Sequence, residues 1–294
     1  MEVLLQQIIN ALNTGSIYAL VAIGYTMVYG IIKLINFAHG DIMMFGAYFG
    51  FLFATIFPFQ LPLMVIIAMS MILAALMGVI IEKVAYKKLR NAPRISALIT
   101  AIGVSLLLQN LALLIFSSDP KVMPPLISTQ KIYMLGLDIP TLTVYTISIS
   151  VSVMVALTLF IHKTKPGKAM RAVSQDADAA KLMGINSNKT ISLTFAIGSA
   201  LGALGGIFYT LAYSQVYPTL GVMPGLKAFV AAVLGGIGNI GGAMLGGYLI
   251  GAIEVFTNGY ISTRWADAIV FAILIIVLLV KPSGILGKNV KEKV

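Results

Sequence analysis

The chain has 294 residues, of which 59% are hydrophobic and 10% charged, and its mean hydropathy is +0.97. A soluble domain would carry about a quarter charged residues, so this composition excludes one. The formal net charge of +10 could indicate a nucleic-acid partner, but the basic residues cluster between apolar runs, as membrane topology requires. Without cysteine there is no thiol chemistry, and His39 and His162 fit no metal-ligand spacing.

Apolar runs long enough to cross a hydrocarbon core of roughly 30 Å recur from end to end. The N-terminus, MEVLLQQIINALN, has neither a basic leader nor a cleavage site, so we expect no signal peptide. The predicted fold is an all-α polytopic transmembrane helical bundle, one domain over 1–294. Helix-breaking and polar residues divide the chain into predicted full spans at 8–32, 36–57, 61–86, 95–116, 141–161, 190–213 and 264–281.

The basic residues indicate the orientation of these spans. Sixteen of the twenty Lys and Arg lie in four places, namely Lys33 and the stretches 83–94, 163–189 and 281–293. Because Lys and Arg are enriched in cytoplasmic loops, the pattern predicts an external N-terminus and a cytoplasmic C-terminus. The proline-rich stretch 117–140 then forms an external loop that could receive a soluble partner.

The apolar run 226–256 is interrupted by glycines at 235–247. Both flanking spans have their nearer ends outside, so the chain must cross an even number of times here. Two shorter helices meeting at the glycine run satisfy this, as a re-entrant hairpin or as two tightly packed spans. Non-helical backbone at such depth is buried in protein or lines a wet cavity, which makes Gly236 and Asn239 candidates for a translocation path.

A second candidate group starts the predicted span at 36–57. Asn36, His39 and Asp41 place an amide, an imidazole and a carboxylate there. Ionisable groups at membrane depth usually face the bundle interior or water, so a role in the path is one hypothesis. The other is that Asn36 or Asp41 caps the helix at the membrane interface.

Further polar side chains lie inside predicted spans. Glu254 is deep in its apolar run and could pair with a buried amide or amine. Gln109 and Asn110 are expected to form hydrogen bonds across helices rather than to touch a substrate.

Glycines at i+4 spacing indicate close helix packing, with sliding surfaces as the alternative. They occur at Gly198, Gly202 and Gly206, at Gly46 and Gly50, at Gly242 and Gly246, and at Gly247 and Gly251. A weak internal similarity at an offset of 200 residues aligns Met44, Gly46 and Tyr48 with Met244, Gly246 and Tyr248. It indicates either paired broken segments in two halves or chance.

The stretch 165–187 is the longest polar interruption and is predicted to be cytoplasmic. One helix is expected over 168–184, opened by Pro166 and Gly167 and stopped at Gly184. Its apolar stripe is Met170, Val173, Ala177, Ala180 and Met183. A lipid-bound helix would have larger apolar residues, so the stripe favours docking into a protein groove.

No nucleotide site is present in the sequence. Gly167–Lys168 and Gly287–Lys288 lack the preceding glycine and the following Ser or Thr of a phosphate-binding loop. We therefore expect the chain to bind no cofactor of its own and any ATP to be bound by a partner.

Four blocks in order resemble the permeases of ABC importers for branched-chain amino acids. AVSQDADAAKLMGIN resembles their cytoplasmic EAA-type loop. The remaining blocks resemble the amino-terminal and carboxy-terminal signatures of the Liv-type H permease family: GSIYALVAIGYTMVYGIIKLINFAHGDIMMFGAY, MPGLKAFVAAVLGGIGNIGGAMLGG and VLLVKPSGILG.

The resemblance implies a non-enzymatic permease subunit that translocates leucine, isoleucine and valine across a bacterial inner membrane. Its implied partners are a second, related permease, two cytoplasmic ATP-binding subunits and an extracytoplasmic substrate-binding protein. The ATPase contacts implied by the loop are Asp176, Ala179, Ala180, Met183 and Gly184, although Gln175–Asp176–Ala177 departs from the simplest EAA pattern.

Other functions remain open on the sequence. An ABC permease for urea, amides or other amino acids would have the same architecture. An ATPase-independent channel or secondary transporter would be expected to carry more ionisable residues at mid-membrane. A membrane enzyme is the weakest alternative, because no catalytic pair of motifs is present.

Overall fold

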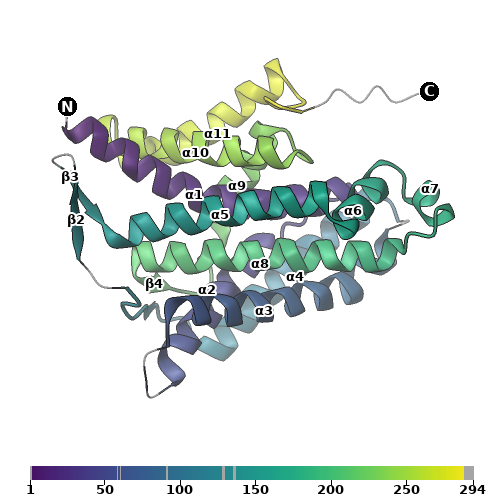
Figure 1. The fold of residues 1–294 in the computed structure, drawn as a ribbon, viewed down its shortest axis with the longest axis horizontal. Helices are drawn as coiled ribbons and strands as arrows, with labels where there is room; N and C mark the ends of the chain where they lie inside the picture. Colours follow the sequence, from purple (N-terminus) through teal and green to yellow (C-terminus); the bar gives the residue numbers. More distant parts are fainter. Residues whose placement is uncertain are drawn as a thin grey trace.

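The computed structural model describes residues 2–57, 59, 61–90, 92–127, 130–134 and 137–287. These residues form a helical bundle, as expected (Figure 1). Its α-helices are α1 (Glu2–Ile32), α2 (His39–Ile56), α3 (Leu63–Ile81), α4 (Arg94–Phe116), α5 (Thr141–Lys163), α6 (Lys165–Gln175), α7 (Ala177–Leu182), α8 (Ser187–Tyr213), α9 (Val222–Gly235), α10 (Ile240–Tyr260) and α11 (Thr263–Val280).

In the described residues, seven helices are long and apolar enough to cross a membrane. The number equals the predicted number of full spans, but the membership differs. The expected span 36–57 is the 18-residue α2, which is not among the seven, whereas α10 of the glycine-broken pair is. The expected span 61–86 is α3 continued by a π-helical turn, Glu82–Tyr86, and a 3-10 turn, Lys87–Leu89.

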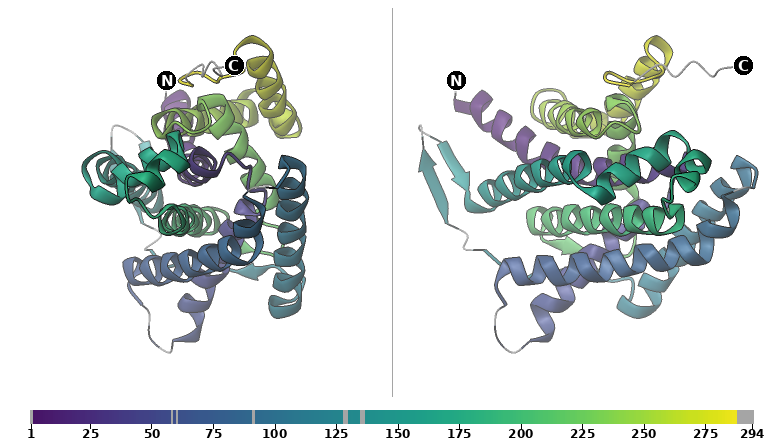
Figure 2. Two further views of the ribbon diagram at one scale, coloured as in Figure 1. Left: turned by 90° about the vertical axis from the view of Figure 1, so that its right-hand side faces the viewer. Right: turned by 45° about the vertical axis from the view of Figure 1, so that its right-hand side comes forward.

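The two ends of the bundle differ in structure. At one end, which we call the hairpin face, strands β2 (Lys131–Met134) and β3 (Leu137–Pro140) form an antiparallel hairpin. Strands β1 (Lys121–Val122) and β4 (Gln215–Val216) pair there also, so the predicted loop 117–140 has some regular structure. The opposite end, the α6–α7 face, carries those two short helices, and α1 starts near the hairpin face (Figures 1 and 2).

The two halves of the bundle share one arrangement in opposite directions. α1 and α8 run antiparallel and pack together at the centre. α1 packs against α9 and α10, as α8 packs against α2 and α3; α2 contacts α3, as α9 contacts α10. α2 therefore corresponds to α9 and α3 to α10, as in an inverted repeat. The alignment of Met44, Gly46 and Tyr48 with Met244, Gly246 and Tyr248 is wrong as a repeat, because it pairs α2 with α10.

The glycine-broken pair consists of two helices of unequal length. Gly236 and Gly238 adopt φ of 106° and 95°, which only glycine adopts without strain, and so reverse the chain between α9 and α10. α10 is long and apolar enough to cross a membrane, whereas α9 has 14 residues. α9 begins inside the bundle, and residues 217–221 lead to it from β4 at the hairpin face. The segment is therefore neither a symmetric re-entrant hairpin nor two complete helical spans.

The polar segment 165–187 contains two helices, so the prediction of one helix over 168–184 is wrong. The chain turns at Asp176, which has extended backbone and whose carboxylate accepts hydrogen bonds from the backbone N–H groups of Asp178 and Ala179, both at 2.9 Å. An aspartate in this position is a favourable N-cap, which competes with helix continuation. The predicted stop at Gly184 is confirmed: its φ is +79°, and the N–H of Ile185 reaches back to the carbonyl of Ala180.

Close packing of α2 against α8 generates the first prediction. A Cβ on Gly46 would overlap the backbone of Ala203, whereas one on Gly103 in α4 would meet nothing within 4 Å. We expect Gly46→Ala to lower the free energy of unfolding by about 1–3 kcal/mol, because the helices must separate. Thermal unfolding of the detergent-solubilised protein measures this.

The matched control is Gly103→Ala, which should stabilise α4 slightly because alanine is the better helix former. Equal midpoints for Gly46→Ala and the unsubstituted protein would contradict the packing role of Gly46.

Candidate functional site

The first turns of α2 and α9 meet inside the bundle. Each helix is preceded by non-helical chain, residues 33–38 before α2 and 217–221 before α9. A Cβ on Gly40 would collide with the carbonyl oxygen of Gly221 and come within 3.2 Å of the Cα of Gly225. Three glycines at this junction thus allow two helix N-termini to approach closely, where side chains would hold them apart.

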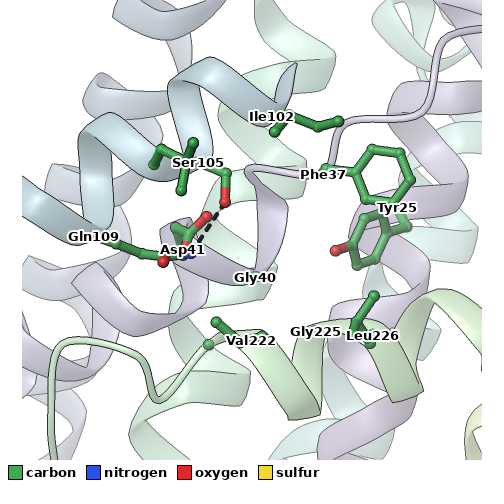
Figure 3. Close-up of a pocket in the computed structure, with 12 residues that line it drawn as sticks. Tyr25, Phe37, Gly40, Asp41, Ile102, Ser105, Gln109, Val222, Gly225 and Leu226 are labelled. Atoms are coloured by element: carbon green, nitrogen blue, oxygen red, sulfur yellow. Dashed lines mark hydrogen bonds between the residues drawn. The ribbon is translucent and has the colours of Figure 1, made fainter. Parts of the chain in front are cut away.

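A cavity of about 170 Å³ lies beside this junction (Figure 3). Its walls come from α1, the link between α1 and α2, and helices α2, α4 and α9. Most of the wall is apolar, with a few polar groups among the apolar side chains. The lining residues are Tyr25, Phe37, Gly40, Asp41, Ile102, Ser105, Leu106, Gln109, Gly221, Val222, Gly225 and Leu226.

Asp41 supplies the carboxylate of this cavity from the first turn of α2, and its exposed fraction is 2%. Gln109 of α4 donates from Nε2 to Oδ1 of Asp41 at 3.0 Å and to Oγ of Ser105 at 3.1 Å (Figure 3). The expected hydrogen bond across helices is confirmed for Gln109. It is wrong for Asn110, which is exposed and donates to the carbonyl of Leu106 in its own helix.

Asn36 and His39 lie next to Asp41 in sequence but outside this cavity. The amide oxygen of Asn36 accepts a hydrogen bond from the Tyr86 hydroxyl at 2.7 Å. The ring of His39 fills the space between α1 and α8 and meets the Tyr25 ring edge-on at 4.5 Å. Neither Asn36 nor Asp41 is an N-cap, since Ala38 occupies that position without a side-chain hydrogen bond. The capping interpretation is therefore wrong.

Gly236 and Asn239 lie at a different level, at the α6–α7 face. Asn239 caps α10 by accepting from the N–H of Gly242 at 3.3 Å, and its Nδ2 donates to the carbonyl of Leu286 at 2.9 Å. This turn fastens the segment that follows α11. Of the five predicted path residues, the structure thus places Asp41 alone in the central cavity, with Asn36 and His39 packed nearby.

A buried ionic network ties α1, α9, α10 and α11 together. Lys227 of α9 is 7% exposed and binds Glu254 of α10, which is 8% exposed, at 2.8 Å, and Asp267 of α11 at 2.7 Å. Tyr18 of α1 donates to the second oxygen of Glu254 at 2.7 Å. The expectation that Glu254 pairs with a buried amine is confirmed. Because the two buried charges, on Lys227 and Glu254, each have an oppositely charged partner and Asp267 is half-exposed, the network is a structural element at this depth.

The α6–α7 surface presents several of the predicted ATPase contacts to solvent. Asp176, Ala179, Met183 and Gly184 are exposed, and Met183 is 82% exposed. Ala180 is 5% exposed and lies in a hollow of about 200 Å³ between the two short helices.

The predicted stripe of the α6–α7 segment is largely buried on both sides of the break: Ala177 is half-buried and Ala180 is in the core, whereas Met183 at the end of the stripe is exposed. Met170 and Val173 are buried in the hydrophobic core formed with helices of this chain. At the exposed edge, a hydrogen bond from Lys181 lowers the pKa of the Asp178 carboxyl below its ordinary value.

Several residues of the cavity were not predicted from the sequence. Tyr25, Ser105 and Leu226 belong to apolar runs in which nothing distinguishes them from packing residues. The sequence does contain an indication for Gly221 and Gly225, because glycines at i+4 spacing indicate a close approach of helices.

Comparison with known proteins identifies the family. Residues 7–278 match the family described as "Branched-chain amino acid transport system / permease component". The chain belongs to this family. It is 44% identical to the high-affinity branched-chain amino acid transport system permease protein BraD of Pseudomonas aeruginosa, over 99% of this chain and 98% of BraD.

Two further relatives show the breadth of the similarity. The chain is 42% identical to the corresponding Escherichia coli protein LivH, over 99% of this chain and 97% of LivH. It is 28% identical to the ribose import permease protein RbsC of Haemophilus influenzae, over 87% of this chain and 77% of RbsC. The chain is thus a multi-pass membrane permease component, and the cavity is a candidate for the site through which such a permease passes its substrate.

The ionic network of this permease generates the second prediction. Lys227→Ala leaves Glu254 buried with Tyr18 as its remaining partner, and we expect a loss of about 3–5 kcal/mol in the free energy of unfolding. The control is Lys131→Ala, which removes an exposed pair with Asp138 and should cost less than about 1 kcal/mol. Thermal unfolding in detergent measures both, and equal losses would contradict the role assigned to Lys227.

Proposed function

We propose that this permease is the membrane subunit of an ATP-driven importer of leucine, isoleucine and valine in a bacterial inner membrane. The observation that carries the proposal is the similarity over the full chain to BraD and LivH, whose names state branched-chain amino acid transport. The cavity supports it, because an apolar wall with a few polar groups suits an amino acid with an apolar side chain.

The orientation follows from charge. Lys33 directly follows α1, whose end lies beside α6, and the stretch 83–90 lies beside Lys189 at the start of α8. With the lysines and the arginine of α6 and α7, these basic residues gather at the α6–α7 face, which is cytoplasmic by the positive-inside rule. The N-terminus is then external and the segment after α11 cytoplasmic.

Three kinds of partner fit this orientation. Two ATP-binding subunits would dock on the cytoplasmic α6–α7 surface and supply the ATP site. A substrate-binding protein would dock on the hairpin face, where residues such as Pro124, Pro125 and Leu142 line a hollow of about 360 Å³. A second, related permease would cover α4, which is apolar, largely exposed and forms one wall of the cavity.

The proposed mechanism uses the junction between the first turns of α2 and α9. Movement of the ATPases would displace α7 and α6, and α6 packs against α1, α5 and α8. Since α1 and α8 hold α9 and α2, their movement would separate or close the first turns of α2 and α9. Access to the cavity would then alternate between the two faces of the membrane.

Uptake by the reconstituted assembly tests the function. Proteoliposomes containing this chain, its partner permease and the ATP-binding subunits should accumulate radiolabelled leucine when ATP is inside and the binding protein is outside. They should not accumulate ribose or urea. Ribose or urea uptake without leucine uptake would overturn the assignment of substrate.

The α6–α7 surface generates the third prediction. Gly184→Glu places a bulky charge where φ is +79°, which strains the turn after α7 and alters the exposed contact surface. We expect co-purification of the ATP-binding subunits with the permease to be lost. The control Asp178→Asn changes a neighbouring exposed carboxylate and should leave co-purification intact. Full recovery of the complex with Gly184→Glu would count against docking at this surface.

The cap of α7 generates the fourth prediction. Asp176→Ala removes both hydrogen bonds to the first turn and should cost about 0.5–2 kcal/mol of local helix stability. Asp176→Ser retains a capping oxygen. ATP-driven leucine uptake should therefore fall with alanine and be largely retained with serine; equal uptake by the two variants would show that the cap does not matter for coupling.

A further inference from the structure

We propose that Asp41 is the group that binds the α-ammonium of the transported amino acid. This inference rests on the proposed function, and it assigns a specificity-determining residue within the cavity between α2, α4 and α9. It starts from the way in which buried charges are compensated in the rest of the molecule.

Two buried carboxylates outside the cavity each have a basic partner. Glu82 pairs with Arg90, and Glu254 pairs with Lys227. Asp41 is at least as buried as Glu254, yet within the described part of the chain no Lys, Arg or His nitrogen lies within ion-pair distance of its carboxylate. Burial of an uncompensated charge is costly, so a carboxylate in this position calls for a cation.

The neighbours of Asp41 do not explain why the side chain is acidic. The donor on Gln109 needs only an acceptor, and the amide oxygen of an asparagine would serve as well. The first turn of α2 favours negative charge, which reduces the cost of the carboxylate without removing it. The packing of α2 against α4 therefore does not require the negative charge of Asp41.

The cation has room to bind because Asp41 faces a cavity rather than a packed interface. A cavity of about 170 Å³ is slightly larger than the 150 Å³ cavity that takes up benzene, so it accommodates a ligand of several heavy atoms. An ammonium group that enters it forms a charge-assisted hydrogen bond with the carboxylate, which is roughly twice as strong as a neutral one.

The remaining lining determines how such a ligand lies. With its ammonium at Asp41, an amino acid has the apolar side chains of Phe37, Ile102 and Leu226 beside its own side chain. The first turn of α9 borders the same cavity at Val222, and helix N-termini favour the negative charge of a ligand carboxylate. The arrangement selects a zwitterion with an apolar side chain over a sugar, urea or a fatty acid.

The test compares leucine with 4-methylpentanoate, which is leucine without its ammonium group. Both are titrated against the purified assembly of permeases and ATP-binding subunits, without the binding protein, and binding is followed by ligand-dependent thermal stabilisation. In the unsubstituted assembly leucine should bind about tenfold to a hundredfold more tightly than 4-methylpentanoate. Equal binding of the two ligands overturns the inference without any variant.

Asp41→Asn keeps an acceptor for Gln109 and removes the charge. We expect leucine affinity to fall about tenfold to a hundredfold, and 4-methylpentanoate affinity to stay the same or to rise because a repulsive carboxylate is gone. Asp41→Glu should keep the preference for leucine. Equal weakening of both ligands by Asp41→Asn indicates a merely structural role and overturns the inference, as does no change in either.

The matched control is Asp267→Asn, which removes a half-exposed membrane-helix carboxylate while Lys227 keeps Glu254. It should leave both affinities unchanged. Leucine uptake by the unsubstituted proteoliposomes separates the two proposals: without uptake the proposed function fails, whereas uptake combined with unchanged ligand preference in Asp41→Asn overturns the role of Asp41 alone.

Discussion

The close approach of helices at glycine holds this permease together. Lipid removes the hydrophobic drive that packs soluble helices, so contact between backbones must supply the attraction. Gly46 and Gly206 bring α2 against α8, and Gly15 and Gly247 bring α1 against α10. These contacts fix the two central helices, from which α2 and α9 reach each other at the junction of Gly40 and Gly221.

The same constraint accounts for the cavity inside the bundle, which is mostly apolar but contains a carboxylate. Where the first turns of α2 and α9 begin, the backbone is not helical, and such backbone is tolerated at depth only when it is buried or borders a cavity. Lys227 pairs nearby with the buried Glu254 and the half-exposed Asp267, and so connects α9 to α10 and α11. Asp41, which has no basic partner among the described residues, lines the cavity.

Local patterns predicted much of the fold, because span length and chain breakers are local properties. The bounds of α4, α5, α8 and α11 agree with the predicted spans to within three residues. The break at Asp176 was missed, because its capping role competes with a helical stripe that continues past it. The cavity could not be predicted as a whole: Tyr25, Asp41 and Gln109 come from three helices and meet only through tertiary packing.

A chain of contacts leads from α6 through α1 to the start of α2, and the proposed coupling would use it. Met170 of α6 lines a small hollow together with Met27 and Gly30 near the end of α1. A displacement of α6 would therefore change its packing against α1. Two turns earlier on α1, Gly24 meets the ring of His39, which starts α2 two residues before Asp41. A packed imidazole between α1 and α8 transmits displacement better than a flexible side chain would, because a dense interior has few alternative positions for it. His39 thus connects the position of α1 to that of the first turn of α2, and in the proposed mechanism it would position Asp41 rather than contact the substrate.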